Sequence, residues 1–339
     1  MQKHIAKFYE KNDDGSIKCQ LCPHRCVIKE GRSGLCRVRK NIDKELIALS
    51  YGKMVSANLD PIEKKPLYHF FPGKNILSVG TLGCNFNCFF CQNWSISQQD
   101  ISATSEGSIE YILPVDLVKI AGRQKTNNNL GIAYTYNEPL IGYEFVLDTA
   151  ILAKKNGLKN VLVTNGYINE EPLKELLPYI DALNIDIKSI EDDFYKKYCR
   201  GSLNPVLKTC EIANKSSLVE ITNLIIPGLN DSEKNIKDLS EWVYNNLGKD
   251  TPLHLSAYRP EYKCNIKSTP VETIKKAYEI ASEKLNYVYA GNVYCQGLDD
   301  TNCPKCGELL IERMGYSVNI KNLKDSHCGK CDSKINIQV

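Results

Sequence analysis

The sequence predicts an α/β protein with a mainly parallel β-sheet and a small cysteine-rich module at each end of the chain. Three observations support this prediction. The chain has 339 residues, 42% apolar and 24% charged, which suits one large domain with appendages or two domains. Apolar runs alternate with segments of helical period through the middle of the chain. Eleven of the 15 cysteines lie in three tight clusters.

Composition and charge exclude several classes of protein. The balance of apolar and charged residues is not that of a disordered or collagen-like chain. The formal net charge of +3 is too small to indicate a polyanionic partner. No run approaches the roughly 18 to 20 apolar residues of a membrane-spanning helix, and the charged N-terminus lacks the apolar core of a secretory signal. We therefore expect a cytoplasmic protein, and its odd cysteine count favours reduced, metal-binding cysteines over disulfides.

The chain divides into three regions. Residues 1–50 form an N-terminal cysteine-rich module, residues 51–298 carry the alternating pattern, and residues 299–339 form a second cysteine-rich module. Nearly continuous apolar strands that alternate with helices are typical of a parallel sheet covered by crossover helices, either flat or curled into a barrel. The expected strands, rich in Ile, Val and Tyr, are 76–82, 131–135, 160–164, 183–187, 218–226, 253–257 and 287–289.

Two of the expected helices have clear signals. The apolar side chains of residues 236–247 recur at the spacing of one helix face. A second helix is expected to open at residues 269–272, where Thr269 can cap the helix and Pro270 suits its first position.

Polar and glycine-rich residues follow the expected strands. Because the carboxyl ends of parallel strands meet at one edge, ligand chemistry is expected there. The segments that should gather at this edge are 83–91, 136–139, 164–166, 186–188, 227–231 and 256–260.

Cys84, Cys88 and Cys91 form a CxxxCxxC motif directly after the first expected strand. Three thiolates on one short loop can ligate three irons of a cubane iron–sulfur cluster, and no fourth cysteine lies close by in the sequence. The fourth iron would stay open to a substrate or cofactor, which suits catalysis better than electron storage. The alternative is a zinc loop, but zinc sites close with paired CxxC or CxxH spacings, and this loop has a single triad.

This loop resembles that of the radical S-adenosylmethionine (SAM) superfamily, whose motif is CxxxCxΦC with an aromatic residue at Φ, here Phe90. The stretches 60–67, 80–85 and 91–94 are similar to the pyruvate formate-lyase activating enzyme-like branch, and within it to the AmmeMemoRadiSam-system radical SAM enzymes. The resemblance runs from about Cys19 to beyond Asn292.

The resemblance implies a partial, roughly (β/α)6 barrel that holds a [4Fe–4S] cluster on the three cysteines of the loop. The open iron would chelate the amino and carboxylate groups of SAM, and the reduced cluster would split SAM into methionine and a 5'-deoxyadenosyl radical that abstracts a hydrogen atom. The protein would orient the reacting bond and exclude water. A low-potential electron donor such as a flavodoxin or ferredoxin is also implied.

The resemblance further implies contacts to SAM. Residues 136–139 stand where the family has Gly-Gly-Glu-Pro, so Glu138 is expected at the SAM ammonium, while Asn137 departs from the second glycine. Asp186 and Lys188 match an Asp-x-Lys that meets the ribose hydroxyls and the SAM carboxylate. The structural alternative for residues 136–139 is a turn, and for Asp186 and Lys188 it is a solvated ion pair. For His254 it is a buried core histidine. The remaining expected contacts are Asn165, Gly228 and His254.

The N-terminal module contains Cys19, Cys22, Cys26 and Cys36. Four thiolates can close a tetrahedral zinc site or hold an auxiliary [4Fe–4S] cluster, and both alternatives fit the spacing. A bound metal would supply the folding energy that so small a core lacks.

The C-terminal module has two CxxC knuckles separated by 21 residues. This is the pattern of a zinc ribbon or a rubredoxin-like pair, so a four-cysteine zinc site is expected, with a single iron as the alternative. A strand is expected at 309–311, and His327 is taken as a bystander. No aromatic platform with basic neighbours predicts nucleic-acid binding. The expected ligands are Cys303, Cys306, Cys328 and Cys331.

Three classes of function compete. The first is a radical SAM enzyme that acts on a small molecule or a protein, with an activase that takes a glycyl hydrogen from a partner protein as its narrower version. The second is a metal-ribbon scaffold or binding protein whose metal sites are only structural. The third is methyl transfer from SAM, which needs no iron. Membership of the family would predict that the radical forms, but it would not predict the substrate on which the radical acts. The isolated cysteines are expected to be small buried hydrophobes: Cys199, Cys210, Cys264 and Cys295.

Overall fold

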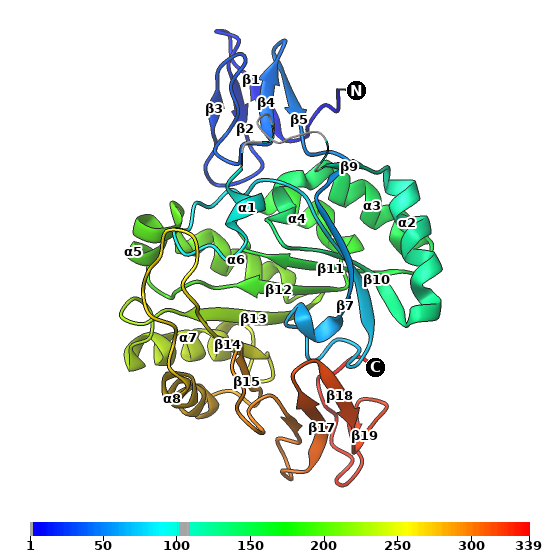
Figure 1. Cartoon of the computed structure of the whole chain (residues 1–339), viewed down its shortest axis with the longest axis vertical. Helices are drawn as coiled ribbons and strands as arrows, with labels where there is room; N and C mark the ends of the chain where they lie inside the picture. Colours follow the sequence, from blue (N-terminus) through cyan, green and yellow to red (C-terminus); the bar gives the residue numbers. More distant parts are fainter. Residues whose placement is uncertain (1–2, 100, 102–106, 108) are drawn as a thin grey trace.

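The computed structural model describes residues 3–99, 101, 107 and 109–339 (Figure 1). Its centre is an eight-stranded sheet with the order β15-β14-β13-β12-β11-β10-β8-β7. The first strand of this sheet along the chain, β7, pairs antiparallel with β8, and the other neighbouring strands pair in parallel. The predicted α/β class with a mainly parallel sheet is therefore confirmed. The strands are β7 (Ser56–Pro61), β8 (Asn75–Gly80), β10 (Asn129–Tyr134), β11 (Lys159–Thr164), β12 (Ala182–Asp186), β13 (Leu218–Ile225), β14 (Leu253–Ala257) and β15 (Val288–Gly291).

Helices connect the parallel strands and cover the outside of the sheet (Figure 1). Ile221 of β13 and Leu255 of β14 are fully buried and belong to one apolar cluster with Val206 and Leu239 from the covering helices. In the described part of the chain, no helix combines the length and apolar character needed to span a bilayer. The helices are α1 (Trp94–Ser97), α2 (Pro114–Arg123), α3 (Tyr143–Lys155), α4 (Glu170–Leu176), α5 (Asp192–Phe194), α6 (Leu203–Ala213), α7 (Glu233–Asn246) and α8 (Val271–Ser282).

The two helices with clear sequence signals are both present. The predicted apolar face at residues 236–247 lies on α7, whose amino end is capped by the Ser232 hydroxyl. The expected cap of α8 is wrong in detail. Pro270 occupies the N-cap position, and Thr269 Oγ1 instead donates to the carbonyl oxygen of Ile225 at 2.6 Å. Thr269 therefore ties the start of α8 to the carboxyl end of β13.

The segment between β7 and β8, residues 62–74, packs against the inner face of the curved sheet, and we call it the floor segment. The backbone amides of Tyr68 and His69 donate to the buried Glu220 carboxylate of β13 at 3.0 and 2.7 Å. Asn184 of β12 donates to the carbonyl oxygen of Pro66 at 2.8 Å. Glu220 lies in the amino-terminal half of β13 and Asn184 at the middle of β12, so the segment forms a floor below the carboxyl edge of the curved sheet.

The two cysteine-rich modules lie at opposite ends of the molecule (Figure 1). The N-terminal module is held to α3 by a buried ion pair, in which Arg39 Nη1 lies 3.0 Å from Glu144 Oε1. The C-terminal module reaches the floor segment, because Arg313 Nη2 donates to the carbonyl oxygen of Tyr68 at 2.9 Å. The expected strand at 309–311 is part of β17 (Leu309–Met314). The smaller strands are β1 (Tyr9–Lys11), β2 (Ile17–Cys19), β3 (Val27–Ile28), β4 (Arg39–Ile42), β5 (Glu45–Ala48), β6 (Lys53–Met54), β9 (Glu110–Tyr111), β16 (Thr301–Asn302), β18 (Ser317–Ile320), β19 (Leu323–Lys324) and β20 (His327–Cys328).

Candidate active site at the carboxyl edge of the sheet

The three-cysteine loop begins just beyond β8 and is tied to the loop after β10 by Asn137. The Asn137 side chain accepts from the Thr81 amide at 3.0 Å and donates to the carbonyl oxygens of Leu82 and Gly83 at 3.2 and 3.0 Å. Through these bonds the buried Asn137 amide fixes the backbone of residues 81–83, at the start of the loop. Asn137 therefore lies at the expected edge, and its side chain binds the backbone of this loop.

Gly83 allows the loop to approach the N-terminal module. Its φ of +87° is one that residues with a side chain rarely adopt. A Cβ atom at this position would lie 2.5 Å from the carbonyl oxygen of Cys36 and 2.8 Å from Val38 Cγ1. The backbone before Cys84 therefore rests directly on the N-terminal module.

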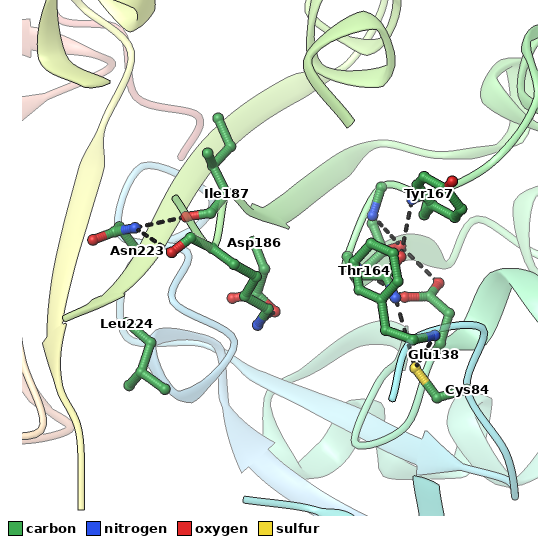
Figure 2. Close-up of polar contacts among 12 residues, drawn as sticks. Cys84, Glu138, Thr164, Tyr167, Asp186, Ile187, Asn223 and Leu224 are labelled. Carbon is green, nitrogen blue, oxygen red and sulfur yellow. Dashed lines mark hydrogen bonds and ion pairs between the residues drawn. The ribbon is translucent and has the colours of Figure 1, made fainter. Parts of the chain in front are cut away.

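The sulfur of Cys84 is surrounded by N–H donors. The backbone amide of Phe86 lies 3.3 Å from Cys84 Sγ, and Asn165 Nδ2 lies 3.6 Å from it (Figure 2). Burial raises the pKa of the free thiols of Cys84 and Cys91. A metal removes the thiol proton, and N–H donors then stabilise the ligated sulfur. The donor set of the loop therefore fits an iron–sulfur cluster.

Glu138 is a buried carboxylate beside the cysteine loop. It accepts a hydrogen bond from Thr164 Oγ1 at 2.7 Å (Figure 2). It also accepts from the Leu140 amide at 3.0 Å and from the Asn165 amide at 2.8 Å. Burial outweighs these bonds and raises the pKa of the Glu138 carboxyl to about 7. An arriving cation would favour its charged form, which is the chemistry that the expected ammonium contact requires.

Asp186 and Lys188 form an ion pair at the end of β12, with 2.8 Å between Oδ2 and Nζ. Burial opposes the charge of Lys188, but the negative charges of the Asp186 carboxylate and of Cys88 as a thiolate outweigh it and raise the pKa of Lys188. The carbonyl oxygen of Lys188 accepts from Asn230 Nδ2 at 2.7 Å. This bond joins the pair to the turn that contains Gly228, whose φ is +74°. Residues 186–188 and the turn at 227–231 therefore both lie at the carboxyl edge of the sheet, as predicted.

His254 does not join this group. It is the second residue of β14, and its Nε2 lies 2.6 Å from Glu220 Oε2. Its ring packs edge-on against Tyr68 of the floor segment, with 4.8 Å between the ring centroids. These contacts match the buried core histidine that was the structural alternative, and an adenosine contact stays a prediction.

Cys199 is the neighbour that the sequence did not reveal. Its side chain lies beside Cys88 and raises the pKa of the Cys88 thiol, and its carbonyl oxygen accepts from the Asn87 amide at 2.9 Å. Cys199 ends a π-helical turn, a rare element that is frequent at functional sites. The expectation that no fourth cysteine lies near the loop is correct along the sequence and wrong in space. No spacing rule could have found this residue.

The C-terminal cysteines have the geometry of a single-ion site. Their four sulfur atoms all lie within 4.8 Å of one another. The Sγ atoms of Cys303 and Cys331 are 3.6 Å apart, and those of Cys306 and Cys328 are 3.7 Å apart. Metal–sulfur bonds of about 2.3 Å in a tetrahedron place the sulfurs about 3.8 Å apart. The predicted four-cysteine cluster is therefore confirmed, and its metal stays a prediction. His327 is not part of it.

The structure combines a mainly parallel sheet with a three-cysteine loop after its first parallel strand, which is the arrangement that the resemblance to radical SAM enzymes implies. Residues 78–243 match the sequence profile of the Radical SAM superfamily. The chain is 30% identical over 173 residues to the pyruvate formate-lyase-activating enzyme of Clostridium pasteurianum, covering 48% of this chain and 67% of that enzyme. The chain therefore belongs to the radical SAM superfamily, and its relatives include activating enzymes.

Two further similarities concern the whole chain and the fold. The chain is 46% identical over 337 residues to an uncharacterised protein of Methanocaldococcus jannaschii, and the alignment covers 98% of each. The crystal structure of a radical SAM methyltransferase from Sphaerobacter thermophilus matches with a TM-score of 0.50 and 18% identity over 71% of each chain. The second match shows a shared fold.

Proposed function

We propose that the carboxyl edge of the sheet binds a [4Fe–4S] cluster through Cys84, Cys88 and Cys91, binds SAM beside it, and abstracts a hydrogen atom from a substrate. When bound, the reduced cluster supplies the electron that cleaves SAM to methionine and a 5'-deoxyadenosyl radical. One observation carries the proposal: one buried and two half-buried thiols, a buried carboxylate and a half-buried ion pair meet at one edge of a parallel sheet.

Each of these side chains has a distinct task toward SAM. The Glu138 carboxylate binds the ammonium group, because a charged acceptor in a buried position forms a strong hydrogen bond. Lys188 carries the positive charge that suits the SAM carboxylate, and Asp186 can accept from the ribose hydroxyls. Asn165 orients the Cys84 sulfur through its amide. Gly228 lets the backbone approach the adenine.

A buried hydroxyl on the inner face of the sheet, that of Thr222, has no hydrogen-bond partner among the described residues. Thr222 is the neighbour of Asp186 across the β12–β13 pair. Buried polar atoms are normally paired, so this hydroxyl supports the presence of a polar ligand above the floor. The floor at residues 62–74 keeps water from entering at the opposite end.

A narrower version of the proposal is an activase that removes a glycyl hydrogen from a partner protein. The similarity to an enzyme named as an activase of pyruvate formate-lyase supports this version. A low-potential flavodoxin or ferredoxin is the proposed electron donor. The short distances among the four sulfur atoms of the C-terminal module support a zinc ion there. This ion would stabilise β17 and its contact with the floor.

The test is anaerobic reconstitution with iron and sulfide, followed by SAM and a strong reductant. We expect 5'-deoxyadenosine and methionine from the wild-type chain. The Cys88→Ala variant should keep its circular dichroism spectrum and form neither product. If the wild-type chain keeps its fold and holds a complete cluster but does not cleave SAM, the scaffold function is supported and the proposal is wrong.

A further inference from the structure

The two four-cysteine sets differ in the spacing of their sulfur atoms. In the C-terminal set all four sulfurs lie within 4.8 Å of one another. Across the part of the chain that the structure describes, which includes the whole N-terminal set, no three N-terminal sulfurs meet this limit. A tetrahedral zinc site requires every sulfur pair to be about 3.8 Å apart. The N-terminal sulfurs are therefore not arranged around a single ion in this structure.

The N-terminal cysteines nevertheless face one common space. All four line the same cavity, together with apolar side chains such as Leu21 and Ile28 and with Arg39. All four are free thiols, two of them buried and two half-buried. In a cubane cluster each cysteine binds a different iron, so the ligand sulfurs stand further apart than around one ion. Four cysteines around one common cavity, with sulfurs that are not grouped around a single ion, fit such a cluster.

This cavity adjoins the loop of the candidate active site. Asn85, which follows Cys84, is part of the cavity wall. His24, from the N-terminal module, places its Nε2 2.7 Å from the carbonyl oxygen of Asn85. Asn85 in turn donates to the carbonyl oxygen of Tyr167 at 2.7 Å, so it is held between the module and the sheet.

We propose that Cys19, Cys22, Cys26 and Cys36 hold a second [4Fe–4S] cluster beside the Cys84 loop, with Asn85 of that loop in the wall of its cavity. This cluster is distinct from the one in the proposed function, because all four of its irons have a cysteine ligand. It therefore has no open iron, and SAM does not bind to it.

The test uses the full chain with the substitutions Cys84→Ala, Cys88→Ala and Cys91→Ala, which leave the N-terminal set intact. After anaerobic reconstitution we expect about four irons and four sulfides per chain, the content of one [4Fe–4S] cluster. The electron paramagnetic resonance signal of the reduced protein should not change when SAM is added. In a matched control that also carries Cys22→Ala and Cys26→Ala, this iron and sulfide should be lost while the C-terminal metal is kept.

A triple variant that binds no iron or sulfide and holds about two zinc ions per chain would overturn the inference in favour of a second zinc site. That result would leave SAM cleavage by the wild-type chain intact, so it is distinguishable from failure of the proposed function. If the triple variant does not fold, Cys22→Ala with Cys26→Ala in the otherwise native chain provides the second measurement. It should lose about half of the wild-type iron and keep a SAM-sensitive signal, and retention of all the iron would contradict the inference.

Discussion

The side chain of Cys199 lies beside the Cys88 thiol and raises its pKa, although the two residues come from different elements far apart in the sequence. The contact is fixed by the Asn87–Cys199 backbone bond of 2.9 Å. It is reinforced at Gly201, where a Cβ atom would lie 2.3 Å from the ring of Phe86. The turn before Gly201 and the cysteine loop therefore form one packed unit, with a thiol held against a sulfur that we propose as an iron ligand.

We predict that Cys199→Ala lowers the reduction potential of the loop cluster. A thiol that donates to a ligand sulfur disperses negative charge and so favours the reduced cluster. Cys199→Ser should retain most of the wild-type potential, because a hydroxyl can donate in the same way. Redox titration monitored by electron paramagnetic resonance, without SAM, measures the shift. Equal potentials in all three proteins would show that the thiol only fills space.

Gly83→Ala should disrupt both the Cys84 loop and the N-terminal cysteine set. The substitution places a Cβ 2.5 Å from the carbonyl oxygen of Cys36 and forces a residue with a side chain to a φ of +87°. Strain of this kind costs about 1–3 kcal/mol, and relieving the clash must move the loop or the module. We expect lower unfolding stability and incomplete iron loading. Gly122→Ala is the matched control, because a Cβ there meets no atom within 4 Å. Equal iron content in both variants would contradict the close approach.

The affinity for SAM should depend on Glu138 and on pH. Burial raises the pKa of this carboxyl to about 7 in the chain without SAM. Below that pH the group is neutral and cannot pair with an ammonium, and above it the group is charged. The dissociation constant should therefore fall as the pH rises through about 7, whereas Glu138→Gln should lack this step. Equilibrium binding of SAM to both proteins between pH 6 and pH 8, about one unit on either side, tests this. Parallel pH profiles would exclude Glu138 as the ammonium ligand.

Cys306→Ser should release the metal of the C-terminal module without removing the loop cluster. One ligand in four is lost, and the free energy of metal binding contributes directly to folding of so small a unit. Because Arg313 of β17 contacts Tyr68 of the floor, we also expect faster proteolysis of residues 299–339 and a lower melting temperature. Metal analysis and limited proteolysis measure these effects. A variant that keeps one zinc ion per chain and wild-type protease resistance would rule out this site.

Local patterns in the sequence were sufficient to predict the sheet and the cysteine loop. Each apolar run became a strand because buried parallel strands need continuous apolar residues, as in β13, where Ile221 is fully buried. The loop triad could be predicted because its ligands are close together in the sequence. The polar segments reached one edge because parallel strands share a direction.

Contacts between distant segments could not be predicted. His254 lies on a buried strand, and its pairing with Glu220 depends on strand register, which the sequence alone does not give. The same limit applies to Cys199, whose position depends on how a π-helical turn packs on the loop. The sequence spacing of the N-terminal cysteines left two kinds of metal site open, and the arrangement of the sulfurs in space distinguishes that set from the C-terminal one.

The most direct test of the central claim is the electron paramagnetic resonance spectrum of the reduced wild-type chain before and after addition of SAM. If Cys84, Cys88 and Cys91 leave one iron open, SAM binds to that iron and the signal changes, and 5'-deoxyadenosine then forms. A fully loaded cluster whose signal is the same with and without SAM, and which yields no 5'-deoxyadenosine, would contradict the claim.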